Sequence, residues 1–136
     1  QETLNQKIIA AASAQKRFAL LPRAKRVAMV EAYAAALKNQ REALADVLHA
    51  ESGKTIAEAL GEVDGSANVL LNTIKDTALP DLGNMQRVKE RPPVGVVGLI
   101  TSFNFPMAVA HWTMAPAFIA GNAVLWEPYE KTPMSA

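Results

Sequence analysis

Cysteine is absent from this chain of 136 residues. Its absence excludes disulfides, thiolate metal ligands and a cysteine nucleophile within these residues. An excess of charge of one sign is also missing, because 14 lysines and arginines stand against 13 aspartates and glutamates. Nucleic acids and anionic membranes bind to clustered positive charge, so we expect neither as a partner.

A long uninterrupted apolar run is missing as well. Residues 107–126 come nearest and are about long enough to span a bilayer, but His111, Pro116 and Asn122 interrupt them. Because polar groups are costly in lipid, we expect no membrane span. Residues 1–19 are polar and show no secretory leader, so the cytoplasm is the expected location. His49 and His111 stand far apart without a carboxylate cluster, so we expect no metal site.

Helix signals dominate the first half of the chain, residues 1–78. After Pro22, which suits a first helical turn, apolar residues recur at helical spacing. They are Val27, Val30, Ala34 and Leu37, and the same apolar face continues through Leu44, Val47 and Leu48. Ser52-Gly53 should end it, since glycine commonly follows the last residue of a helix.

Thr55 and Glu58 have the spacing of a capping box, in which each side chain satisfies the other's free backbone amide. The helix that they open should run to about Lys75. Gly61 and Gly65 weaken this expectation, since each costs roughly 1 kcal/mol against alanine. The expected apolar positions are Ile56, Leu60, Val63, Leu70 and Leu71.

Strand signals appear in the second half. Residues 85–91 suit a short polar edge strand, and the β-branched run 94–101 suits a strand buried on both faces. Gly95 and Gly98 lie inside that run, where glycine permits close packing of another backbone.

After the run, Phe105-Pro106 should begin a helix that reaches about Ala120. Gly121-Asn122 should turn the chain into a second short strand over 123–126, and Thr132-Pro133 resembles the start of a further helix. A strand, a helix and a strand with a compact crossover predict two parallel strands, and hence an α/β fold. Such a pair leaves edges and faces uncovered, so we expect a part of a larger domain, with exposed apolar surface around both strands.

Polar loops follow both expected strands. Residues 101–106 follow the first and residues 127–130 the second, and ligands of open α/β sheets bind at these carboxyl ends. A binding site and ordinary loop chemistry remain alternatives on this evidence. Gly53-Lys54-Thr55 resembles the end of a phosphate loop, but the earlier glycine and the preceding strand are missing, which favours a helix stop. Lysines and glutamates of the first half are interpreted as solvated helix faces.

Three segments resemble the aldehyde dehydrogenase family. They are PVGVVGLITSFNFP at 93–106, WTMAPAFIAGNAVL at 112–125 and EKTPMSA at 130–136. Glu51-Ser52-Gly53-Lys54 is similar to a helix end that is usual in the family. The resemblance implies helices over 1–78 that pack on a cofactor domain, an arm or linker over 79–92, and the first βαβ unit of a Rossmann-like NAD(P)-binding sheet over 93–136. The stretch 76–91 is short for the family's oligomerisation arm.

The resemblance also implies an activity. The family oxidises aldehydes to carboxylic acids with NAD or NADP through a cysteine thiohemiacetal. Asn104 matches the asparagine whose amide holds the oxyanion, and Glu130 matches a glutamate near the adenine ribose. Four further positions match the strand end that lines the cofactor, namely Ile100, Thr101, Ser102 and Phe103.

Glu127 stands where the family pattern has a lysine that reaches the adenosine ribose. A carboxylate accepts hydrogen bonds from ribose hydroxyls and repels a 2′-phosphate, so we expect NAD in preference to NADP. Tyr129, where a small residue is usual, would crowd the adenosine pocket.

The family's catalytic cysteine and water-activating glutamate would lie beyond Ala136. We therefore expect these residues to be the amino-terminal part of a longer homo-oligomeric enzyme, and to be inactive alone. An alternative is a non-catalytic, truncated or decayed homologue that acts as a partner-binding module. An acylating or semialdehyde-specific member is a third alternative, and the substrate aldehyde is not identified.

Overall fold

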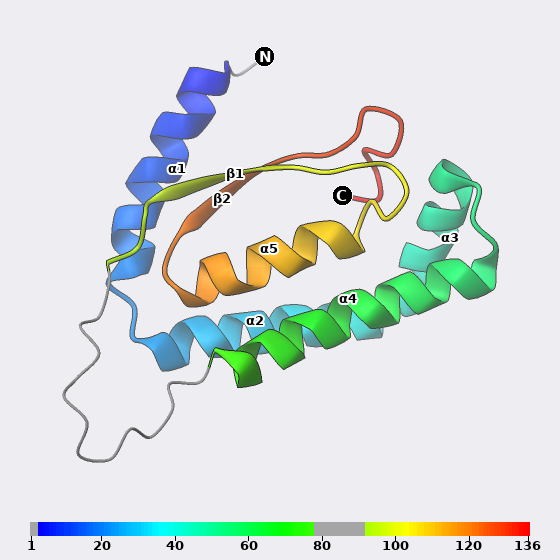
Figure 1. Ribbon diagram of the computed structural model, residues 1–136, viewed down its shortest axis with the longest axis horizontal. Helices are drawn as coiled ribbons and strands as arrows, with labels where there is room; N and C mark the ends of the chain where they lie inside the picture. The colour runs from blue at the N-terminus through cyan, green and yellow to red at the C-terminus, as the bar shows by residue number, and fades with distance from the viewer. Residues whose placement is uncertain (1–2, 78–91) are drawn as a thin grey trace.

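The computed structural model describes residues 3–77 and 92–136, which form five helices and two strands (Figure 1). In chain order these elements are α1 (Leu4–Ala19), α2 (Arg23–Asn39), α3 (Arg41–Ser52), α4 (Ile56–Asp76), β1 (Val96–Ile100), α5 (Ala108–Ile119) and β2 (Ala123–Glu127). The predicted edge strand over 85–91 lies outside the described residues, and so does the predicted arm apart from its last residue.

The apolar face predicted after Pro22 belongs to two helices. α2 begins directly after Pro22, but Gln40, at φ −107° and ψ 20°, separates it from α3. The prediction of one continuous helix from Pro22 to Ser52 is therefore wrong, because the chain bends at Gln40. Arg41, the first residue after the bend, contacts α4. There its guanidinium donates to both carboxylate oxygens of Asp64, each at 2.8 Å. Gly53 ends α3 at φ 72°, as predicted.

The predicted capping box of α4 is confirmed. The Thr55 hydroxyl accepts from the Glu58 amide at 3.3 Å, and the Glu58 carboxylate accepts from the Thr55 amide at 2.9 Å. Val63 and Leu70 are fully buried, as expected, whereas Ile56 is 41% exposed.

Gly61 and Gly65 do not interrupt α4, and a Cβ added at either meets nothing within 4 Å. Alanine restricts the unfolded chain more than glycine does, so Gly61→Ala and Gly65→Ala should each raise the free energy of unfolding by roughly 0.5–1 kcal/mol. Urea unfolding measures the change. Gly121→Ala is the control and should destabilise, since Gly121 has φ +88° and its Cβ would lie 3.1 Å from Pro93 Cγ. Destabilisation by both α4 variants would show that this surface is packed in the natural protein.

The two strands pair in parallel, as predicted, with Val96 opposite Ala123 and Ile100 opposite Glu127. The connecting helix, α5, begins two residues after Pro106. One of its faces packs on the strands, because Ala110 and Met114 form a buried cluster with Leu99. The crossover therefore covers one face of the strand pair.

The prediction that β1 is buried on both faces is wrong for the described residues. Leu99 is 8% exposed, but its neighbour Ile100 is 85% exposed, because successive side chains point to opposite faces and α5 covers one of them. The close backbone packing predicted at Gly98 is also absent there, since a Cβ would meet nothing within 4 Å. Gly95 instead adopts φ +116°. With Val94, before β1, 84% exposed, the expected exposed apolar surface is found around β1, whereas the apolar side chains of β2 are partly buried.

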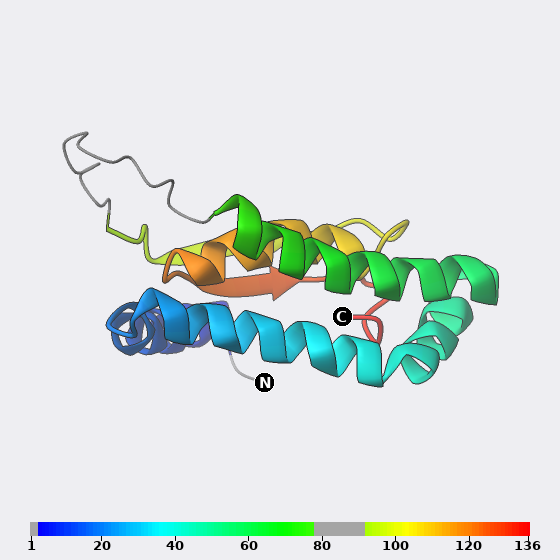
Figure 2. The same ribbon diagram turned by 90° about the horizontal axis from the view of Figure 1, so that it is seen from below.

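One hydrophobic core joins the helical half to the βαβ unit. It contains side chains from α2, α3 and α4 together with Met107, Ala115 and Ile119. In Figure 2, α4 and α5 lie above the strand level and α2 below it. Arg23 and Arg26, in the first turn of α2, donate at 2.9 Å to the carbonyls of Thr77 and Ile119, which end α4 and α5. Cationic groups at these carboxyl ends also oppose the helix dipoles.

The described helices include none with both the length and the apolarity to cross a bilayer. α5, the most apolar of them, has 12 residues and contains Pro116.

Candidate functional site

The loops after β1 and β2 meet at the carboxyl ends of the strands, as predicted (Figure 1). The amide of Thr101 donates to the carbonyl of Glu127 at 3.3 Å, which extends the strand pairing by one bond. Beyond it the rings of Phe103 and Tyr129 lie 5.4 Å apart between centroids. The two loops therefore form one continuous surface.

The first two predicted cofactor-lining residues have different environments. Ile100 projects from the open face of β1 and is free to contact a ligand there. Thr101 is 6% exposed, and its hydroxyl accepts from the indole Nε1 of Trp126 at 2.9 Å. This bond fixes the point at which the loop leaves the sheet, so the Thr101 side chain supports the loop.

Asn104 is exposed at the tip of the loop. Its side-chain carbonyl accepts from the Ser102 hydroxyl at 2.6 Å. Because an asparagine amide has one acceptor and one donor end, this bond leaves the nitrogen to donate elsewhere. Asn104 thus presents an oriented donor at the carboxyl end of β1.

Glu127, the last residue of β2, and Glu130, on the loop after it, are both exposed. Ionised carboxylates only accept hydrogen bonds, so these two residues suit a ligand that carries hydroxyl groups. The structure brings all seven predicted site residues to the carboxyl ends of β1 and β2 and the loops that follow them: Ile100, Thr101, Ser102, Phe103, Asn104, Glu127 and Glu130.

A buried ion pair lies beneath the first loop and was not predicted. The Lys54 ammonium lies 2.9 Å from Glu62 Oε2, and these side chains are 14% and 1% exposed. The interpretation of first-half lysines and glutamates as solvated is therefore wrong at these positions. The sequence held one signal, because Glu62 shares the buried face of α4 with Ala59, Val63 and Ser66.

Glu51 holds the chain after the second loop. Its carboxylate accepts from the amides of Met134 and Ser135 at 2.8 and 2.6 Å, and from the Ser135 hydroxyl. Burial opposes ionisation of Glu51, but these hydrogen bonds outweigh it and lower its pKa. Met134 and Ser135 form a turn on this carboxylate, and the helix predicted to start at Thr132-Pro133 stays a prediction, since only three residues follow Pro133 here.

His111 is buried next to the loop. Its Nδ1 lies 2.7 Å from the carbonyl of Met107 and its Nε2 lies 2.8 Å from the Tyr33 hydroxyl. Burial lowers the pKa of His111, although the Met107 carbonyl and the charge of Glu62 oppose that shift. A neutral ring that donates from Nδ1 and accepts at Nε2 satisfies both contacts. His111 therefore joins α2 to the start of α5 and is closed to solvent.

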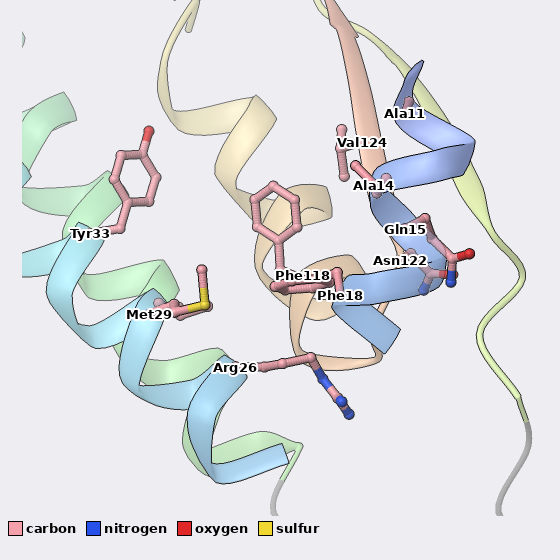
Figure 3. A pocket seen from close by; sticks show the side chains of 12 residues that line it. Ala11, Ala14, Gln15, Phe18, Arg26, Met29, Tyr33, Phe118, Asn122 and Val124 are labelled. Carbon is pink, nitrogen blue, oxygen red and sulfur yellow. The ribbon is translucent and has the colours of Figure 1, made fainter. Parts of the chain in front are cut away.

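An apolar cavity lies elsewhere. It has a volume of about 410 Å³ and opens between α1, α2, α5 and the amino end of β2 (Figure 3). Its polar side chains serve the fold, since Gln15 donates to the Gly121 carbonyl and Arg26 to that of Ile119. Ligands of open α/β sheets bind at the opposite, carboxyl end of the strands. Among residues 3–77 and 92–136 no cluster of potential metal ligands occurs either.

Comparison with known proteins shows which family shares this arrangement. The model of the aldehyde dehydrogenase family matches residues 1–136. Malonate-semialdehyde dehydrogenase 1 of Bacillus licheniformis is 37% identical over 134 residues, which are 93% of this chain and 28% of that protein. N-succinylglutamate 5-semialdehyde dehydrogenase 1 of Caulobacter vibrioides is 35% identical over 130 residues, 90% of this chain and 27% of that protein.

Solved structures agree with the sequence comparison. NADP-dependent glyceraldehyde-3-phosphate dehydrogenase of Bacillus halodurans, complexed with NADP, superposes with a TM-score of 0.85 at 29% identity, over 96% of this chain and 30% of that one. Betaine aldehyde dehydrogenase of Staphylococcus aureus, in complex with NAD+, gives 0.85 at 28% identity, over 96% and 28%. The chain thus spans less than a third of the length of these relatives.

Proposed function

Because the chain belongs to the aldehyde dehydrogenase family, we propose that it contributes amino-terminal helices (1–78) and the first βαβ unit (93–136) to an enzyme that oxidises an aldehyde to a carboxylic acid. A bound NAD or NADP supplies the acceptor for the hydride. The nucleophilic cysteine and the water-activating glutamate come from residues outside this segment, which contains no cysteine. This chain alone is inactive on this proposal.

The oriented amide of Asn104 carries the proposal. When a thiolate attacks an aldehyde, negative charge develops on the carbonyl oxygen. A donor that is already in place stabilises this charge without reorganisation during the reaction. The Ser102 hydroxyl, 2.6 Å from the Asn104 side-chain oxygen, sets which end of the amide points toward the substrate.

The remaining loop residues fit a dinucleotide. Exposed carboxylates at Glu127 and Glu130 accept hydrogen bonds from ribose hydroxyls, while Ser102 and the exposed ring of Phe103 border the same edge. The Tyr129 ring packs against Phe103, so it lies against the first loop. Glu127 and Glu130 would hold the adenosine end of the cofactor through its ribose hydroxyls.

Glu127 makes NAD the preferred cofactor on this proposal. A 2′-phosphate near its carboxylate meets a repulsion of about 1–4 kcal/mol for like charges about 4 Å apart, so kcat/KM should favour NAD over NADP by about fivefold or more. The test is steady-state turnover of a panel of aldehydes with each cofactor, by the natural protein at its full length. Glu127→Lys should reduce or reverse the preference, whereas Glu31→Lys, an exposed charge change on α2, should leave it unchanged.

Comparable turnover of NAD and NADP by the unmodified protein would overturn the NAD preference and leave the dehydrogenase proposal standing. Absence of turnover with both cofactors across the panel would overturn the dehydrogenase itself. That second outcome would support a non-catalytic homologue.

A further inference from the structure

Lys54 makes three contacts beneath the loop that carries Asn104. Its ammonium pairs with Glu62 at 2.9 Å, donates to the backbone carbonyl of Asn104, and lies 4.2 Å from the centre of the Phe105 ring. The lysine follows Gly53 in the turn between α3 and α4, fifty positions before the loop. One cation from the helical half therefore holds two successive residues of the loop.

Glu62 fixes the same loop at its other end. Its Oε1 accepts from the amides of Met107 and Ala108, each at 3.0 Å. α5 begins at Ala108 and has no side-chain cap from its own residues. Since the first amides of a helix lack partners within the helix, the carboxylate from α4 supplies the missing cap and lies at the positive end of the helix dipole. The start of α5 is thereby fixed relative to α4.

The turn that carries Lys54 is itself anchored to the second loop region. Glu51, at the end of α3, binds the backbone at Met134 and Ser135. From the last turn of α3, the imidazole Nδ1 of His49 lies 2.5 Å from the Lys54 carbonyl. The chain segments that follow both strands are thus attached to one short stretch, residues 49–54. We call Lys54 and Glu62 the loop clamp.

Stability alone is a weak reason for a buried ion pair. Removing two charges from water costs free energy, and apolar residues of similar volume often serve a fold equally well. What a directed pair provides is a fixed geometry for the groups around it. Here the groups around it are the Asn104 carbonyl, the Phe105 ring and the first amides of α5.

We propose that Lys54 is a positioning residue for the oxyanion, which holds the backbone of Asn104 so that its side-chain amide meets the substrate oxygen. Glu62 orients the Lys54 ammonium and fixes the end of the loop. This proposal rests on the proposed dehydrogenase function, because only that function gives the Asn104 amide a reacting partner. Lys54 itself touches neither substrate nor cofactor.

A double-mutant cycle tests the proposal in the natural protein at its full length. Lys54→Met should lower kcat roughly tenfold to a hundredfold, since misplacement of a reacting group by about 1 Å has effects of that size. KM for the dinucleotide should change little. In the Asn104→Ala background the same change should cause no further loss, because the amide that Lys54 positions is already gone. Lys75→Met, an exposed change on α4, should leave kcat unchanged in both backgrounds.

Equal losses from Lys54→Met in the two backgrounds would overturn the proposal, because a general structural role does not depend on Asn104. An unchanged kcat in Lys54→Met would also overturn it. If the single variant fails to fold because the Glu62 charge is left buried, Lys54→Met combined with Glu62→Gln removes both charges and takes its place in the cycle.

Hydrogen exchange separates failure of the clamp from failure of the proposed function. The peptide 101–110 should exchange faster in Lys54→Met than in the unmodified protein or in Lys75→Met, while α2 stays protected. If the peptide exchanges faster in Lys54→Met but the unmodified protein oxidises no aldehyde, the proposed function is wrong, while the inference that Lys54 holds the loop stands. If the peptide exchanges at its original rate, Lys54 does not hold the loop and the inference is wrong.

Discussion

Replacing Asn104 by alanine should lower kcat for aldehyde oxidation by roughly a hundredfold to a thousandfold, as removal of one oxyanion donor does in other acyl-transferring enzymes. The amide is worth this much only when negative charge develops on the substrate oxygen. KM for the dinucleotide should therefore change little, because the carboxylates that we propose for its ribose, Glu127 and Glu130, lie at the end of β2 and on the loop after it. Steady-state kinetics with the natural protein at its full length measure both quantities.

Two further variants make this result specific. Asn104→Asp has almost the same shape but replaces the donor with a negative charge, so its loss should equal or exceed that of alanine. Ser102→Ala keeps the amide and removes the bond that orients it, 2.6 Å long, so its loss should be smaller, about tenfold or less. A kcat within threefold of normal in both Asn104 variants would show that this side chain stabilises no developing charge.

Local signals in the sequence predicted the elements well. The Thr55–Glu58 spacing is a self-contained device, because each side chain bonds the other's backbone within one turn, and the structure shows both bonds. Gly53 and Gly121 stop helices through their own backbone angles. The break at Gln40 escaped prediction because the apolar positions keep a helical spacing across it. Arg41, directly after the break, pairs with Asp64 of α4, and this contact between two helices leaves no mark in the local spacing.

Burial was harder to predict than secondary structure. The apolar run that contains β1 has the composition of a strand covered on both faces. Composition does not say whether the helices or strands that cover those faces belong to the same segment of the chain. In the described residues α5 covers the Leu99 face, and Ile100 stays exposed on the other. The predicted close packing at Gly98 failed for the same reason, since the backbone expected there is not among these residues.

The two site loops were predicted together because parallel strands bring their carboxyl ends to one edge. That rule concerns neighbouring strands, and it says nothing about a helix turn fifty positions earlier. Lys54 was interpreted as part of a helix stop, and nothing adjacent to it in the sequence indicates its contact with Asn104. Glu62 was the detectable member of the clamp, since a carboxylate among Ala59, Val63 and Ser66 on one helix face needs a buried partner.

Glu62→Ala should have the largest effect on stability, a loss of about 3–5 kcal/mol in the free energy of unfolding, as expected when one member of a buried ion pair is removed. The change leaves the Lys54 ammonium, which is 14% exposed, without its counter-ion. It also leaves the amides of Met107 and Ala108 without an acceptor at the start of α5. Urea unfolding of the natural protein at its full length measures the loss.

Glu62→Gln separates these two contributions. The glutamine carbonyl can still accept from both amides at the position of Oε1, while the charge opposite Lys54 is gone. Since the geometric cap survives, we expect a loss of about 1–3 kcal/mol, the range for a hydrogen bond or charge left without its partner. A glutamine variant as unstable as the alanine variant would assign the whole effect to the ion pair. An alanine variant that unfolds at the original urea concentration would show that α5 begins equally well without a cap from α4.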